Sequence, residues 1–156
     1  MLLLKMVPNQ KVGAEHGRRR FVKEVIVLKI LDDFYNYVES QGIDKNAIYE
    51  EKGDGFVVIS FSEKGEENRI YNIAIVFYEN DNDVEIYVRK SIKDFDELTL
   101  LRKLNALNCE YTDVTFFVDD NMLGVKSYLS SQGKLENVLI KMVSDVQLAQ
   151  TEFIRI

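Results

Sequence analysis

The chain has 156 residues, of which 46% are hydrophobic and 29% charged, and its formal net charge at pH 7 is −6. This composition is typical of a globular protein with a sizeable core, and it excludes a disordered or low-complexity chain. Residues 1–23 hold six basic residues and one acidic residue, whereas the other 133 hold 14 basic and 25 acidic residues, a net −11. A body this acidic repels phosphate backbones, so we expect no nucleic-acid partner.

The chain contains one cysteine, Cys109, and one histidine, His16. It therefore can form no internal disulfide, and these two residues cannot supply a zinc tetrad. No apolar run reaches membrane-spanning length. We expect no metal, no other cofactor and no membrane partner, and a location in the reducing cytoplasm. Cys109 has no histidine nearby in sequence to activate it, so we predict a small packed core residue.

Residues 1–20 match no folded pattern, and we predict a flexible leader in front of one domain over 21–156. Within it, Arg18, Arg19 and Phe21 resemble a twin-arginine export motif. Export would require an uncharged apolar run, whereas charged residues such as Glu24 and Lys29 follow. The arginines are therefore interpreted as a solvated charge run.

The segment from Phe21 to about Gly42 has the apolar spacing of a helix. Gly42 stands where a C-cap glycine belongs. The stripe recurs at intervals of four, three and four residues and is broadened at its margins by Ile30 and Tyr37; its members are Val27, Leu31, Phe34 and Val38. An acidic turn is predicted next, at Glu50, Glu51 and Asp54.

Three strands are predicted after that turn, over 56–61, 70–78 and 84–89. The middle one is apolar on both faces, which is typical of a central strand. The carboxylates and amides at 79–83 are interpreted as a turn and not as a calcium loop of the EF-hand type. Counted from Asp81, the sixth and twelfth positions are Ile86 and Ile92, where glycine and glutamate are required.

A second helix is predicted to begin at the Asp94–Glu97 start signal and to end at Asn108. Its stripe consists of Leu98, Leu101, Leu104 and Leu107, with Leu100 beside it. A hairpin of strands 114–118 and 123–129 follows around Asp119-Asp120-Asn121. Gly133 precedes a last helix with a buried stripe at Leu135, Val138, Leu139, Met142, Val143, Val146, Ala149 and Phe153.

The predicted order is helix, three strands, helix, two strands, helix. Because successive strands with short loops pair antiparallel, we predict an α+β fold whose five-stranded sheet is covered by helices. Apolar residues on the second and last helices exceed what one small domain usually buries; off the stripe of the last helix they are Ile140, Leu148 and Ile154. They indicate a partner surface or, as readily, a broad core face.

Two local features carry a resemblance to a known family: the run Leu-Asn-Ala-Leu-Asn at 104–108, and the strand–acidic turn–strand–helix from Val114 to Leu135. Together with the element order over 21–156, they resemble the YbjN-like family of proposed bacterial sensory-transduction regulators, which shares the fold of type III secretion chaperones. The resemblance implies a small, acidic, cytoplasmic protein that binds other proteins, often as a homodimer. It implies no catalytic residues. In chaperones of this fold the second helix makes dimer contacts, which here implies Leu98, Leu101 and Leu104.

The leading hypothesis is a non-enzymatic protein-interaction module, adaptor or chaperone-like, with an unknown client protein and a second copy of itself as partners. One alternative is RNA binding, because helix–three strands–helix over 22–110 is the order of a double-stranded-RNA-binding domain. Acidic residues stand where that class places lysines at the start of its second helix. The other alternative is an enzyme with an unrecognised small-molecule site. The adjacent Asp119 and Asp120 do not indicate one, because neighbouring carboxylates on a turn point apart.

Overall fold

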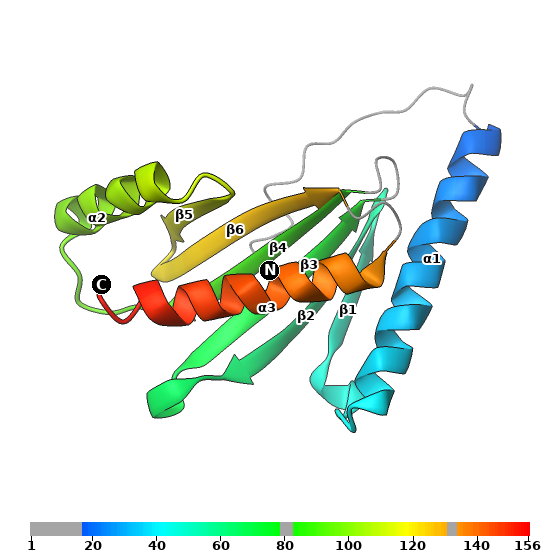
Figure 1. Cartoon of the computed structure of the whole chain (residues 1–156), viewed down its shortest axis with the longest axis horizontal. Helices are drawn as coiled ribbons and strands as arrows, with labels where there is room; N and C mark the ends of the chain where they lie inside the picture. The colour runs from blue at the N-terminus through cyan, green and yellow to red at the C-terminus, as the bar shows by residue number, and fades with distance from the viewer. Residues whose placement is uncertain (1–16, 79–82, 131–133) are drawn as a thin grey trace.

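The computed structural model describes residues 17–78, 83–130 and 134–156, with side-chain surroundings from Lys29 onward. Its three α-helices are α1 (Gly17–Ser40), α2 (Glu97–Glu110) and α3 (Leu135–Glu152). Within the described ranges six strands form one antiparallel sheet in the order β1-β2-β3-β4-β6-β5 (Figure 1). The strands are β1 (Tyr49–Gly53), β2 (Phe56–Lys64), β3 (Ile70–Tyr78), β4 (Asp83–Ser91), β5 (Val114–Asp119) and β6 (Met122–Ser130).

The α+β class is confirmed, but the prediction of five strands is wrong. The residues interpreted as an acidic turn form β1, which pairs antiparallel with β2 so that Glu51 lies opposite Val58. The turn itself is confined to Asp54 and Gly55. β1 lies at the edge of the sheet, where side chains remain partly in water and need no apolar alternation. Its sequence, Tyr-Glu-Glu-Lys-Gly, therefore lacks the signal by which strands are recognised.

The main core lies between one face of the sheet and all three helices. Alternate residues of the strands point into it, including Ile59, Ile75 and Ile86, each 0% exposed. From α1 the predicted residues Leu31, Phe34 and Val38 join this core; the side chain of Val27 lies outside the described part. Gly42 has a φ of +67° and ends α1 as predicted, in a Schellman motif. In that motif Ile43 N donates to Val38 O and Gly42 N donates to Glu39 O.

The opposite face of the sheet carries a second, smaller apolar cluster of Phe56, Val58, Ala74 and Val76. Two tyrosines border it and both donate to Glu85 Oε2, Tyr78 at 2.9 Å and Tyr87 at 2.7 Å. Lys126 Nζ lies 2.7 Å from Glu85 Oε1. The carboxylate of Glu85 is therefore fully engaged by its neighbours on β3, β4 and β6.

Helix α2 differs from its prediction at both ends. The N-cap is Asp96, whose carboxylate accepts from Thr99 N at 2.8 Å, whereas Asp94 precedes the helix with a φ of +52°. The helix continues past Asn108 to Glu110. Cys109 is exposed on it, so its prediction as a core residue is wrong.

The hairpin of β5 and β6 is confirmed, and its turn residues Asp120 and Asn121 both have positive φ, as a type I′ turn requires. β6 pairs with β4 on its other side, so the sheet continues across the helical connection. The breaking role predicted for Gly133 and most of the turn predicted at 79–83 lie outside the described residues.

Candidate interaction surface

Helix α3 packs across the sheet and buries the greater part of its predicted stripe (Figure 1). Val138, Val146, Ala149 and Phe153 are buried, while Leu135, Leu139 and Met142 are partly buried against the same core. Val143 departs from the prediction, because 49% of it is exposed. Asp145, next to Val146, points inward and is 1% exposed. A purely hydrophobic stripe would have an apolar residue at that position.

The charged residues of α3 beyond its first turn are directed inward and are paired. Lys141 Nζ lies 2.9 Å from both Asp145 Oδ1 and Asp113 Oδ2. The hydroxyl of Ser127 on β6 donates to Asp145 Oδ2. At the last residue of the helix, the buried Glu152 accepts from the Tyr111 hydroxyl at 2.9 Å.

Burial raises the pKa of Asp145, and its bonds to Ser127 and Lys141 oppose that shift without cancelling it. Burial alone would lower the pKa of Lys141, but its hydrogen bonds to Asp113 and Asp145 prevail and raise it. The cluster therefore keeps its charges by mutual pairing. Such pairs contribute little net stability, yet breaking one leaves an uncompensated buried charge.

The outward side of α3 has the opposite character. From residue 137 to residue 154 every exposed residue is uncharged, in a chain with 29% charged residues. Three of them are apolar: Ile140 is 62% exposed, Val143 49% and Ile154 52%. We call this set the α3 outer face; its members are Asn137, Ile140, Val143, Ser144, Gln147, Thr151 and Ile154. Depletion of charge around exposed apolar side chains is typical of the centre of a protein–protein interface.

A hollow of about 550 Å³ adjoins the C-terminal half of this face. Its far wall comes from the loop and strand start at 66–71, where Arg69 Nη2 lies 2.6 Å from Glu67 Oε2. Arg69 Nη1 is buried without a hydrogen-bond partner among the described atoms. The outer face is thus continuous with a concave region that also contains an unused donor; the hollow is lined by Glu66, Arg69, Tyr71, Gln147, Gln150, Thr151 and Ile154.

The six contact residues predicted from the sequence fall into three groups. Ile140 and Ile154 lie together on the α3 outer face. Leu98 and Leu101 are exposed on a different helix, α2, at 58% and 41%. Leu104 and Leu148 are not available as surface contacts: Leu104 is 3% exposed in the core, and Leu148 packs partly buried against it. Val143 was missed because its spacing also fits the inward stripe.

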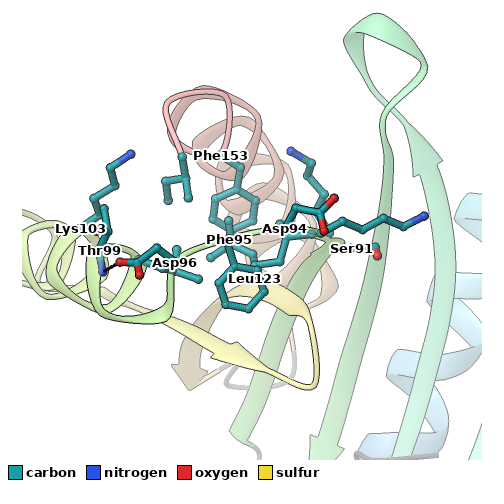
Figure 2. A pocket seen from close by; sticks show the side chains of 13 residues that line it. Ser91, Asp94, Phe95, Asp96, Thr99, Lys103, Leu123 and Phe153 are labelled. Carbon is teal, nitrogen blue, oxygen red and sulfur yellow. Dashed lines mark hydrogen bonds between the residues drawn. The ribbon is translucent and has the colours of Figure 1, made fainter.

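A second hollow, of about 420 Å³, lies where β4 passes into α2. Figure 2 shows Phe95, Leu123 and Phe153 gathered at its centre and Asp96 bonded to Thr99. Three lysines stand on its rim: Lys90, Lys93 and Lys103. Lys103 donates to the carbonyl oxygen of Arg155 at 3.3 Å. Lys90 and Lys93 form no ion pair with any described carboxylate, and burial, with nearby Arg69, lowers the pKa of Lys90.

Over the described ranges no group of three or more His, Cys, Asp or Glu residues is arranged to hold a metal ion. Among the same residues, none of the helices combines the length and the apolar character that crossing a bilayer requires.

Comparison with known proteins shows a structural likeness. No family model and no curated protein matches the sequence. The chain is similar to the crystal structure of YbjN from E. coli, described as a proposed transcription regulator, with 17% sequence identity and a TM-score of 0.47. The overlap covers 79% of this chain and 84% of the YbjN chain. Function is therefore inferred from this chain's own residues.

Proposed function

We propose that this protein is a non-enzymatic protein-interaction module, adaptor or chaperone-like, and that the α3 outer face is its contact surface. The proposal rests on the distribution of side chains on α3, whose charged residues beyond the first turn face the core while some of its apolar residues face solvent. Lys141, Asp145 and Glu152 are directed inward and paired, whereas Ile140 and Val143 are exposed.

Exposed apolar residues alone are ordinary, because much of any protein surface is apolar. The α3 outer face differs in that its charges are displaced to the inner side, where burying them costs free energy. A surface that only met water would have no reason to exclude charge. Docking a protein there desolvates amide, hydroxyl and aliphatic groups and no ionised one, so little of the burial energy is lost.

The test places a photoreactive benzophenone amino acid at Val143 in the full chain, expressed in its source cell. A matched control carries the same amino acid at Arg102, an exposed position on α2. We expect covalent protein adducts from position 143 and few from position 102, identified by mass spectrometry. Equal labelling from both positions, or none from 143, contradicts the proposed surface.

RNA binding is less well supported by the fold. Four strands, β1 to β4, stand between α1 and α2, whereas a double-stranded-RNA-binding domain has three there. The net charge of −6 also opposes phosphate contact. We expect no shift of duplex RNA in a gel at low salt, where such contacts are strongest.

A second candidate function is binding of a small anion with an apolar tail in the hollow of Figure 2. The specific observation is an apolar centre beside two lysines without ion-pair partners, Lys90 and Lys93. Pockets of 300–1,000 Å³ commonly hold small ligands. The carboxylates of Asp94 and Asp96 also line this one, and that of Asp96 is engaged by Thr99 N at the start of α2. Decanoate, but not decanol, is then expected to raise the melting temperature, and Lys93→Met to abolish the effect. Lys29→Met, at an exposed lysine of α1, is the matched control.

A further inference from the structure

We propose that the occupant of the α3 outer face is the same face of a second copy of this chain, with the two helices antiparallel about a two-fold axis at Gln147. This inference rests on the proposed interaction surface and adds the identity of the partner.

The evidence is the symmetry of the face about Gln147. A two-fold axis exchanges each residue with the one equally distant on the other side, so an interface of this kind requires a self-complementary patch. Seven residues from Gln147 in either direction stand Ile140 and Ile154, both about half exposed or more. Seven residues are close to two helical turns. Ile154 lies two residues past the end of α3, but the C-cap Phe153 keeps αR backbone angles, so Ile154 continues the side of the helix that carries Ile140 and Gln147. Ile140 thereby meets Ile154 of the partner subunit.

Residues closer to Gln147 are also paired by type on its two sides. Four residues from Gln147 stand Val143 and Thr151, both β-branched, and three residues from it stand Ser144 and Gln150, both polar and uncharged. Gln147 itself meets its own copy. An amide carries donors and an acceptor, so it can bond to an identical group, which a lysine or a glutamate cannot.

Electrostatics favours this face over the rest of the surface. Each copy has a formal charge of −6, so two copies repel one another at most orientations. The α3 outer face brings no like charges together, because its exposed residues from 137 to 154 carry none.

The size of the face sets the expected strength. The stretch 140–154, which covers the C-terminal part of α3 and the turn after it, extends about 21 Å and presents one ridge of side chains. That is well short of the ~800 Å² that each partner buries in a standard interface. We therefore expect a reversible dimer with a dissociation constant on the order of micromolar and not a permanent one.

Disulfide trapping tests the axis directly in a Cys109→Ser background, which removes the single native thiol. Packed helix axes about 8–10 Å apart, with Cα atoms about 2.3 Å from each axis, leave facing Cα atoms roughly 4–5 Å apart. This overlaps the range that a disulfide spans. Gln147→Cys is expected to form a covalent dimer under mild oxidation.

Ile140→Cys is the matched control, because the axis places its own copy about 21 Å away. Alone it should stay monomeric, but mixed with Ile154→Cys it should give the mixed disulfide. The inference is overturned if Gln147→Cys fails to cross-link while circular dichroism shows a native fold, or if Ile140→Cys alone cross-links as readily.

Sedimentation velocity of the full chain supplies the second readout. We expect concentration-dependent dimerisation that Ile140→Glu weakens at least tenfold and Leu98→Glu, equally exposed on α2, leaves unchanged. A pure protein that stays monomeric, while position 143 still captures a foreign protein in the cell, overturns the second copy and leaves the interaction surface standing. A monomer without adducts overturns both.

Discussion

The two edges of the sheet are protected in different ways. At one edge, α2 lies along β5 (Figure 1), and the amide of Asn108 replaces a neighbouring strand. Its Nδ2 donates to Phe116 O at 3.0 Å, and its Oδ1 accepts from Phe116 N at 2.7 Å. At the other edge, β1 has side-chain contact with α1 through the Tyr35 hydroxyl, which donates to Glu50 Oε2 at 2.6 Å.

The difference shows what each edge must prevent. β5 carries Phe116 in the core, so a slip in its pairing would displace core side chains. Two hydrogen bonds between the Asn108 side chain and the Phe116 backbone fix the strand in place. β1 contributes no fully buried side chain, and its Glu50, Glu51 and Lys52 discourage strand addition by charge. Mutations should therefore matter more at the β5 edge than at the β1 edge.

The largest effect is expected from Asn108→Ala, because it leaves the backbone N–H and C=O of Phe116 without partners. We expect a loss of about 3 kcal/mol in the free energy of unfolding, measured by urea denaturation. Asn105→Ala, at an exposed position one turn earlier on α2, is the control and should cost well under half of that. Equal losses in both variants would contradict the edge-closing role of Asn108.

A smaller and paired effect is expected at two glycines that lie under cross-strand phenylalanine rings. A Cβ on Gly124 would stand 2.3 Å from the Phe117 ring, and one on Gly53 would stand 2.1 Å from the Phe56 ring. Gly124→Ala should destabilise by about 2 kcal/mol, because β6 is held between β4 and β5. Gly53→Ala should cost about half as much, since β1 can shift at its free edge. A larger loss at Gly53, measured by thermal unfolding, would reverse the ranking of the two edges.

The smallest effect is expected from Tyr35→Phe, which removes the contact between α1 and β1. Burial, followed by the hydrogen bond and charge of Glu50, raises the pKa of Tyr35 from 10.0 to about 12. A raised pKa means that the contribution of Tyr35 is fully present below pH 10 and is lost between pH 10 and about 12. We expect the stability difference between wild type and Tyr35→Phe to shrink across that interval, followed by urea denaturation at successive pH values. A difference that stays constant would contradict the assignment.

Regular periodicity made most of the fold predictable from the sequence. The three helices, five of the six strands and the hairpin turn at Asp120 and Asn121 follow from apolar spacing and turn chemistry. β1 was missed because Glu50, Glu51 and Lys52 need no apolar side at a free edge. The helix start was placed at Asp94, two residues early, because Asp94 has an acid three residues later, Glu97, whereas the N-cap Asp96 has Thr99 there.

The surface of α3 was only partly predictable. Ile140 and Ile154 depart from the apolar stripe in sequence, and that departure is a readable signal. The inward direction of Asp145 is not readable, because its partners Ser127 and Asp113 are brought to it only by the folded sheet. Without those partners Asp145 reads as solvated and Val143 as buried, the reverse of their positions.

The order of strands has a kinetic consequence. Among the described strands, β4 and β6 form the pair that is not consecutive in the chain, with Asp83 opposite Ser130. The β1–β4 meander and the β5–β6 hairpin can each zip locally, but joining them requires closing a loop that contains α2 and β5. We therefore expect the pairing of β4 with β6 to limit the folding rate. Truncating Val125 on β6 to alanine should then slow folding more than truncating Val57 on β2.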